Sequence, residues 1–246
     1  MCTVSWRATE DGYDLFFNRD EQRTRAAERP PEALQRNGVR ILMPADGHSG
    51  GTWLATNDRA LTVCLLNDYT APRHPAPGQP RHSRGHVVAA AADAVTAVDV
   101  FQRVQAQPLP RTDPFRLLAL SPRQPALLLH WDGATLDAAE RPLLPPMLTS
   151  SSYAPAEVAA ARLATYLRLV RDPARPSVGD LAAFHRQHDP VAGAHSIAMS
   201  RPDAATRSTI HVSVDRNRVV LAYRSPTNTL TLRLERHQAG QPSAPA

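Results

Sequence analysis

Cysteine occupies position 2 of this 246-residue chain, directly after the initiator methionine. If Met1 is removed, Cys2 carries both a thiol and a free α-amine, and the amine can then act as a general base for its own thiol. The unperturbed pKa values, roughly 7.7–8.0 for an α-amine and about 8.5 for a thiol, are close enough for proton transfer near neutral pH. Cys2 is therefore a candidate nucleophile. The alternative is that it is a small buried core residue.

A run of polar residues, Asn18-Arg19-Asp20-Glu21, follows Cys2 at the distance of one predicted hairpin. A carboxylate such as Asp20 would hold a nearby α-ammonium in its charged form, and Arg19 could fix that carboxylate or bind an acidic group of a substrate. If the strand continues this far, alternation directs Asn18 and Asp20 toward Cys2 and leaves Arg19 and Glu21 as scaffold. The purely structural alternative is that the four residues join a strand end to a neighbouring loop.

The order of several short motifs resembles the NRDE family, also called the Transport and Golgi organisation 2 family. The resemblance is dense over residues 1–85 and thinner afterwards. The segments that carry it are Cys2, Asn18-Arg19-Asp20-Glu21, Gly50-Gly51-Thr52-Trp53, Asn67-Asp68-Tyr69, Ser83-Arg84-Gly85 and the later His195-Ser196-Ile197-Ala198-Met199 with Asp203 and Thr206. The four-residue motif alone is weakly specific, whereas these segments in this order are specific for the family.

The family is similar to the N-terminal nucleophile hydrolases, particularly the choloylglycine hydrolase and penicillin acyltransferase branch. The resemblance implies that Cys2 is the nucleophile, that Asn18 and Asp20 form the Asn-x-Asp element, and that Asn67 is an oxyanion donor. A third element of that branch reads Leu-Thr-Asn. Its nearest match here is Leu148-Thr149-Ser150, so the chain departs from the hydrolase pattern at Ser150.

Two functions from different classes are consistent with these residues, and both require a small-molecule substrate or ligand. The first is a hydrolase or acyltransferase that acts on a non-peptide C–N amide bond through a Cys2 acyl-enzyme, with Asn67 donating to the oxyanion. The second is a non-catalytic binding or trafficking protein on the same fold, because eukaryotic members of the family have been linked to haem handling and to lipid or acyl-CoA metabolism. The retained Cys2, Asn18, Asp20 and Asn67 favour the first function, and Ser150 favours the second.

The composition excludes several other classes. Hydrophobic residues make up 42% of the chain, which is enough for a sizeable core, and the net charge is +5. All 28 basic residues are arginines. They are scattered rather than clustered, so we expect no nucleic-acid partner. No apolar run approaches the ~18 residues of a membrane span and no signal-peptide pattern opens the chain, so we expect a cytoplasmic protein. Motifs of lipases, NTPases and dinucleotide-binding proteins are absent.

Cysteine and histidine usage indicates neither a disulfide framework nor a metal centre. The chain has two cysteines, and Cys64 lies in a buried-strand pattern over residues 61–66, so we expect it in the core. Ten histidines are present, but none combines with cysteines or carboxylates at a recognised zinc spacing, so no metal or cofactor is expected. Trp53 is expected to be a core residue rather than a platform for a ligand.

Hydrophobic periodicity predicts strands at both ends of the chain and helices between them. An N-terminal hairpin is expected around the turn Asp11-Gly12. The predicted strands cover residues 2–7, 13–17, 39–43, 60–67, 115–121, 126–131, 195–199, 208–214, 218–223 and 230–234. One helix is predicted over residues 86–105 and a second over 155–170, with Leu163, Leu167 and Val170 on its buried face. A third begins at the capping residue Ser177.

Terminal strands with helices between them predict an α+β fold. The resemblance implies, more specifically, an αββα four-layer sandwich of the N-terminal nucleophile hydrolase type, with the first strand central and Cys2 at the mouth of a pocket between the two sheets. We expect a single domain over residues 1–237, a proline-rich loop over 71–86, and a disordered tail over 238–246.

Overall fold

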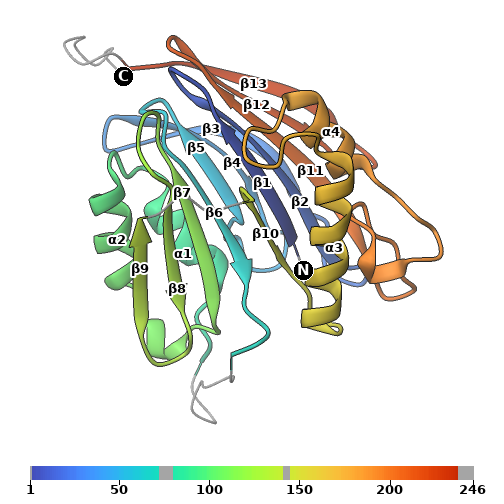
Figure 1. The fold of residues 1–246 in the computed structure, drawn as a ribbon. Coiled ribbons are helices and arrows are strands. Elements are labelled where there is room, and N and C mark those ends of the chain that lie inside the picture. Colours follow the sequence, from blue (N-terminus) through green and yellow to red (C-terminus); the bar gives the residue numbers. More distant parts are fainter. Residues whose placement is uncertain (1, 72–79, 141–144, 238–246) are drawn as a thin grey trace.

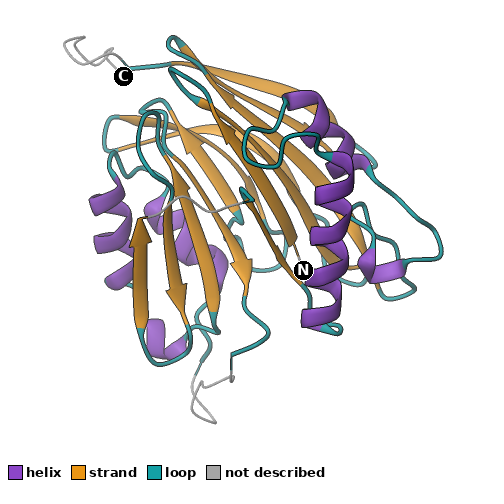
Figure 2. Ribbon diagram, viewed as in Figure 1, coloured by secondary structure: helices purple, strands orange, loops and turns teal. Residues whose placement is uncertain are grey.

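The computed structural model describes residues 2–71, 80–140 and 145–237. Over these residues the chain forms two antiparallel sheets that face each other, and helices cover the outer face of each sheet (Figures 1 and 2). The first sheet contains, in spatial order, β10 (Met147–Ser150), β1 (Cys2–Ala8), β2 (Tyr13–Gln22), β11 (Ala204–Val214), β12 (Arg218–Arg224) and β13 (Thr229–Glu235). The second contains β3 (Arg29–Arg36), β4 (Val39–Ala45), β5 (Leu54–Asn57), β6 (Thr62–Asn67), β7 (Phe115–Leu120), β8 (Leu127–Trp131) and β9 (Leu136–Glu140).

The helices complete four layers. Helices α3 (Pro155–Leu169) and α4 (Val178–Arg186) pack on the first sheet, and α1 (Arg84–Ala91) and α2 (Ala97–Gln105) pack on the second. Short 3-10 turns, η1 (Leu109–Arg111) and η2 (Gly193–His195), connect helices to strands. Figure 1 shows α1 and α2 on one side of the paired sheets and α3 and α4 on the other. This arrangement is the predicted αββα sandwich.

Apolar side chains fill the three spaces between the four layers. Between the sheets, alternate residues of β1, β2 and β11, such as Val4, Leu15 and Val212, are fully buried. Phe115 belongs to the cluster beneath α1 and α2, and Phe184 to the cluster beneath α3 and α4. Because both faces of each sheet are covered, the central strands are buried almost throughout and show weaker polar alternation than a solvated sheet.

The single helix predicted over residues 86–105 is wrong, because the structure has α1 and α2 separated by a turn. Thr96 is the N-cap of α2: its side chain accepts from the Asp99 N–H while the Asp99 carboxylate accepts from the Thr96 N–H. Asp93 in the turn is buried and paired with Arg103. A reciprocal cap of this kind begins a new helix, and it outweighs the continuous alanine-rich pattern.

The predicted inner face of α3 is also wrong. Leu163 and Leu167 are 38% and 52% exposed, although Val170 is buried as expected. The residues that contact the sheet include Tyr166 and Arg162, both fully buried. Arg162 faces inward because the sheet presents polar partners to it, and this rotates the two leucines toward solvent.

The strand predicted over residues 195–199 is not formed. This segment contains the end of η2 and a loop whose backbone groups are satisfied by side chains and by Gln187, which caps the end of α4. The N–H of Ala198 donates to the carbonyl of Gln187 at 2.8 Å, and Asn18 Nδ2 donates to the carbonyl of Ile197 at 3.2 Å. Partners of this kind replace a neighbouring strand.

The N-terminal hairpin and the other predicted strands are confirmed, with ends shifted by a few residues. Four strands were not predicted from the sequence: β3, β5, β9 and β10. The strand β3 carries Pro30 and Pro31, which edge positions tolerate because an edge strand leaves some N–H groups unpaired. Most of the loop predicted over 71–86 and the whole tail over 238–246 lie outside the described residues, and α1 begins within the predicted loop at Arg84.

Candidate active site

Cys2 begins β1 and lies between two neighbouring strands of the first sheet. Its register partners are Ser150 on β10 and Arg19 on β2. Side chains that are directly opposite on neighbouring strands share one face of the sheet, so these side chains face the space between the two sheets. Cys2 is 9% exposed and lines a cavity of about 630 Å³.

The cavity lies where the end of β2 meets loops of the second sheet and the start of α1. Most of its lining residues are of ionisable types, although the side chain of Asp20 is fully buried behind the sheet. They are Cys2, Arg19, Asp20, Glu21, Arg25, Asp46, His48, Tyr69, Arg81, His82, Arg84, His86 and Asp113; the remaining lining residues are Gln22, Ser49, Thr52, Trp53, Leu65, Asn67, Ser83 and Gly85.

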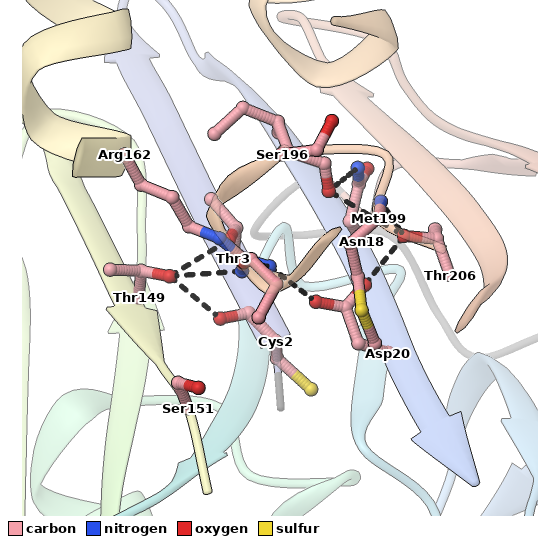
Figure 3. Close-up of polar contacts among 12 residues, drawn as sticks. Cys2, Thr3, Asn18, Asp20, Thr149, Ser151, Arg162, Ser196, Met199 and Thr206 are labelled. Carbon is pink, nitrogen blue, oxygen red and sulfur yellow. Dashed lines mark hydrogen bonds and ion pairs between the residues drawn. The ribbon is translucent and has the colours of Figure 1, made fainter. Parts of the chain in front are cut away.

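The prediction that Asn18 and Asp20 face Cys2 while Arg19 is scaffold is wrong. Asn18 is the register partner of Thr3, so alternation places Asn18 and Asp20 on the helix-covered face of the sheet and Arg19 on the face of Cys2. In Figure 3 the sulfur of Cys2 points away from the Asp20 carboxylate. Asp20 reaches the thiol through its backbone N–H instead, which hydrogen-bonds to the sulfur.

Burial and charge act in opposite directions on the thiol of Cys2. Burial is the largest influence and raises the pKa of the Cys2 thiol above its usual value. The N-terminal ammonium lowers the pKa, as do the Arg19 guanidinium and the Asp20 N–H, whereas the negative charge of Asp20 raises it. The pKa of Cys64 is raised by burial as well, and Cys64 is completely buried between the sheets, as predicted.

Arg19 joins the two sheets beside the cavity. Its Nη1 lies 2.7 Å from the Glu28 carboxylate, its Nη2 lies 2.6 Å from Asp46, and its guanidinium stacks 4.4 Å above the ring of Trp53. Burial acts to raise the pKa of Asp46, but hydrogen bonds from Arg25 and other groups outweigh it and hold that pKa below its usual range. Asp46 therefore stays ionised, and Arg19 is held by Glu28, which precedes β3, and by Asp46, which follows β4, rather than by Asp20.

Glu21 and Trp53 complete this side of the cavity. Glu21 lies at the rim, with its carboxylate 3.5 Å from Arg19 and 3.6 Å from Arg25. Trp53 is buried in the core between the sheets, as predicted, and also lines the cavity.

The carboxylate of Asp20 is held by a buried arginine that the sequence did not indicate. Arg162 Nη2 on α3 lies 3.0 Å from Asp20 Oδ2, and both side chains are fully buried. Thr206 Oγ1 donates to Asp20 Oδ1 at 2.6 Å, and Arg162 also donates to the carbonyl of Ala194 at 2.9 Å (Figure 3). The one feature of the sequence that could have indicated this role is that Arg162 stands among the apolar positions of a predicted helix.

The same guanidinium supports the backbone of Cys2 from behind the sheet. Arg162 Nη1 donates to Thr3 Oγ1 at 2.7 Å and to Thr149 Oγ1 at 3.2 Å. Thr149 Oγ1 in turn lies 3.2 Å from the carbonyl oxygen of Cys2, to which it donates. Strands β10, β1 and β2 are thus tied together at the residues that flank the thiol (Figure 3).

The side chain of Asn18 has a structural role, because its hydrogen bonds are made to His185 and Ile197 behind the sheet. Its Nδ2 donates to the carbonyls of His185 and Ile197 at 2.9 and 3.2 Å, so its Oδ1 accepts from His185 Nδ1 at 2.9 Å. His185 Nε2 must then accept from Ser5 Oγ at 2.8 Å. Burial lowers the pKa of His185 to about 3, and the charge of Arg162 adds to this effect. Ser5, His185 and Asn18 resemble a catalytic relay, but all are buried away from the cavity and they fasten α4 to the sheet.

Asn67 lies in the same cavity as Cys2, as the predicted oxyanion donor would. Its Nδ2 donates to Tyr69 Oη at 2.7 Å. An amide nitrogen carries two N–H groups, so one remains for another acceptor. Ser150 does not line the cavity; its Oγ accepts from the backbone N–H of Cys2 at 3.2 Å.

Two glycine motifs interlock at the rim of the cavity. A Cβ on Gly51 would lie 2.5 Å from the carbonyl carbon of Gly85, and the Thr52 N–H donates to the Gly85 carbonyl at 3.0 Å. This close approach of two backbones requires glycine, which explains the Gly-Gly-Thr-Trp and Ser-Arg-Gly segments. The two segments hold the first turn of α1 against the residues that precede β5.

Neither a metal centre nor a membrane span emerges from the described part of the chain. Among residues 2–71, 80–140 and 145–237, no group of three histidine, cysteine or acidic side chains is arranged to hold a metal ion. Every helix in these ranges is too short or too polar to cross a membrane.

The two facing sheets, with helices on both outer faces, form the four-layer fold of the N-terminal nucleophile hydrolases. The model of the Transport and Golgi organisation 2 family matches residues 1–151, more than half of the chain. The chain belongs to this family. No curated protein matches the sequence.

Solved structures with a similar fold include the three that follow. Penicillin V acylase from Agrobacterium tumefaciens has a TM-score of 0.61 at 11% identity, over 95% of this chain and 86% of its own. A conjugated bile acid hydrolase from Clostridium perfringens has a TM-score of 0.54 at 12% identity, over 96% of this chain and 92% of its own. An N-acylethanolamine-hydrolyzing acid amidase orthologue from Caenorhabditis elegans has a TM-score of 0.54 at 8% identity, over 86% of this chain and 92% of its own. At these identities the likeness establishes the fold.

Proposed function

We propose that this protein, once Met1 is removed, is an N-terminal cysteine hydrolase or acyltransferase that cleaves a non-peptide C–N amide bond of a small molecule. The observation that carries the proposal is the position of the Cys2 thiol. It faces the cavity, accepts a hydrogen bond from the Asp20 N–H and lies on the same face as Arg19. The fold of the acylases and amidases described above supports the same class of reaction.

The proposed reaction has two halves. The sulfur of Cys2 attacks the amide carbonyl carbon, forming an S–C bond and an oxyanion that the Asn67 amide N–H stabilises. The α-ammonium of Cys2 gives a proton to the leaving nitrogen as the C–N bond breaks, and a thioester remains. A water molecule then loses a proton to the α-amine and attacks the thioester, which releases a carboxylic acid and restores the thiol. An amine in place of water gives acyl transfer.

Removal of Met1 changes the electrostatics of the thiol in the direction that the reaction needs. While Met1 is present, burial holds the pKa of the Cys2 thiol above its usual value even though the charge of the N-terminal ammonium lowers it. Cleavage places the N-terminal amine on Cys2 itself, and such an amine titrates at roughly pH 7.7–8.0 in its unperturbed state. The amine can accept the thiol proton, and its positive form then stabilises the thiolate.

Acyl-enzyme formation tests the proposal directly. Intact-mass analysis should first show that purified protein begins at Cys2. A β-lactone, which acylates nucleophilic cysteines by opening its ring, should then add once to the protein, and peptide mapping should place the adduct on Cys2. The Cys64→Ala variant should react like the wild type, and Cys2→Ala should not react. Protein that begins at Cys2 and gives no adduct, or an adduct at Cys64, would refute the proposal.

Ser150 is the observation that favours a second candidate function, a non-catalytic binding or trafficking protein for haem or for acyl-CoA and other lipids. Asparagine stands at this position in the hydrolase branch, and here the serine hydroxyl accepts a hydrogen bond from the backbone N–H of Cys2. Equal ligand affinity of the wild type and Cys2→Ala, together with absence of turnover, would favour this candidate. The ionisable lining of the cavity favours a small polar substrate over a long acyl chain.

A further inference from the structure

A second cavity, of about 640 Å³, lies apart from Cys2 at the ends of β11 and β12 and along the segment that follows β2. None of its lining residues lines the cavity at Cys2. The side chains that give it chemical character are those of Arg23, Arg207, His188, Glu28 and Tyr223.

Two arginines of this cavity have only neutral partners. Arg23 donates to the carbonyl of Arg201 at 3.0 Å and to Ser200 Oγ at 2.8 Å. Arg207 donates to the carbonyls of Gln22 and Arg23 at 3.5 and 3.3 Å. No carboxylate of the described residues lies within 4.0 Å of either guanidinium.

This pattern differs from the one at Cys2. There, Arg19, Arg25 and Arg81 each pair with a carboxylate at 3.2 Å or less. Each of these three arginines is therefore neutralised by a carboxylate at short distance, whereas Arg23 and Arg207 have no carboxylate within 4.0 Å among the described residues, and Arg23 acts on Asp203 only from farther away.

A β-bulge positions one of the two arginines. The pairing of β11 with β2 shifts between Thr206, opposite Asp20, and Ser208, opposite Arg19. Arg207 is the extra residue and has no cross-strand partner. Bulges of this kind redirect a side chain and are frequent beside functional sites.

The other charged groups of the cavity leave its positive charge uncancelled. Glu28 is the one carboxylate that lines it, and Glu28 is bound by Arg19 at 2.7 Å and by Tyr223 Oη at 2.7 Å. Asp20, behind the lining residue Thr206, is neutralised by its buried partner on α3. His188 Nδ1 contacts a backbone carbonyl at 2.7 Å, so its Nε2 is the nitrogen that can meet a ligand.

We propose that this second cavity binds a small anion with several oxygen atoms, either a phosphate or a polycarboxylate, through the guanidinium groups of Arg23 and Arg207. Planar guanidinium groups match the geometry of such oxygen pairs and form charge-assisted hydrogen bonds with them. The hydroxyls of Ser200 and Thr227 lie close enough to the cavity to supplement these contacts. The site is separate from Cys2, so the proposal does not depend on the proposed hydrolase activity.

Calorimetric titration with inorganic pyrophosphate and with citrate tests the site on the full chain. The wild type should bind at least one of them saturably, and Arg23→Gln with Arg207→Gln should weaken binding roughly tenfold or more, as expected for lost charge-assisted hydrogen bonds. Arg168→Gln with Arg175→Gln removes the same charge from exposed arginines outside the cavity and should leave affinity unchanged.

The two anions also distinguish the ligand chemistry, since preference for pyrophosphate indicates a phosphoryl group and preference for citrate indicates a carboxylate. Absence of saturable binding of both, or an equal loss in the control variant, overturns the proposal.

Chemical footprinting provides a test that needs no variant. Phenylglyoxal modifies accessible arginines, and peptide mass mapping of the wild type reports each position. A bound anion should protect Arg23 and Arg207 but leave Arg168 and Arg175 as reactive as before. Equal modification of Arg23 and Arg207 with and without a saturating anion would rule out their part in the site.

Discussion

The thiol of Cys2 differs from that of Cys64 in access more than in chemical type. Both are buried, and burial raises the pKa of each. Cys2, however, lines a cavity beside the positive charge of Arg19, whereas Cys64 is completely enclosed between the sheets. A thiol reacts as its thiolate and only where a reagent can reach it.

The first prediction is that iodoacetamide alkylates Cys2 of the folded protein at least about tenfold faster than Cys64, because access and the nearby charge both favour it. Rates should be measured by peptide mass mapping, with Cys64→Ser and Cys2→Ser as the matched single-thiol proteins. In denaturant the two rates should converge. Faster labelling of Cys64 in the native state would mean that Cys2 is an ordinary core residue.

A second prediction concerns Asp20 and its buried partner. Asp20→Ala leaves the guanidinium of Arg162 buried without its counter-ion, which should lower the free energy of unfolding by about 3–5 kcal/mol. Cys2→Ser should cost far less, since the two side chains are similar in size. Guanidinium chloride titrations should compare both with Asp203→Ala, whose side chain is 62% exposed and whose ion pair is worth about 1 kcal/mol or less. Similar losses for Asp20→Ala and Asp203→Ala would contradict the buried pair.

The sequence indicated some site residues and misplaced others for a physical reason. Cys2 and Asn67 were recognisable because their motifs are local, and the structure brings them to one cavity. Asn18 and Asp20 were assigned to the wrong face, because the register between two strands cannot be derived from alternation within one of them. Arg162 was missed because its partners lie 142 and 159 positions away in the chain.

At the scale of elements, the confirmed predictions are those that depend on local signals. The strands of the terminal hairpins show apolar side chains at alternate positions, and Ser177 caps α4 as predicted. The failures occur where a partner outside the element decides the outcome. The inward face of α3 follows Arg162, and the segment over 195–199 is held by the Asn18 side chain of β2 and by the carbonyl of Gln187, which caps the end of α4. Tertiary contacts override local propensity in both cases.

Helix α4 supplies a third prediction, on the pH dependence of stability. Burial lowers the pKa of His185 to about 3 in the native state, against about 6.5 in an unfolded chain. Between these values the unfolded state binds more protons, so the free energy of unfolding falls as pH falls, by up to roughly 1.4 kcal/mol per pH unit. Above pH about 6.5 the contribution is constant.

Comparison with variants isolates this contribution from that of the carboxylates. His185→Gln removes the titrating group, so its deficit relative to the wild type should shrink as the pH is lowered from about 6.5 to about 4.5. His48→Gln, at an exposed histidine, is the matched control for the substitution itself. Urea titrations at several pH values measure both. A His185→Gln deficit that is independent of pH would mean that the native histidine can be protonated in place.

At the scale of the whole molecule, one charged network connects the two sheets beside Cys2. Tyr223 on β12 donates to Glu28, Glu28 binds Arg19 on β2, and Arg19 binds Asp46 and stacks on Trp53 in the second sheet. The side chains of Arg19, Glu28 and Asp46 are 7%, 6% and 8% exposed. Arg19 is therefore a buried link between the first sheet and the residues that flank the strands of the second.

The last prediction is that Arg19→Met weakens both the fold and the thiol environment. It leaves two largely buried carboxylates without this cation, which should lower the free energy of unfolding by about 3–5 kcal/mol. It also removes a charge that lowers the pKa of the Cys2 thiol, so the pH profile of Cys2 alkylation should shift to higher pH.

Arg81→Met is the control, because Arg81 is 59% exposed and its pair with Asp113 should be worth about 1 kcal/mol or less. Because buried pairs are screened little by salt, the loss in Arg19→Met should persist in high salt. An Arg19→Met protein as stable as Arg81→Met, with an unchanged alkylation profile, would show that the sheets are held in place without this network.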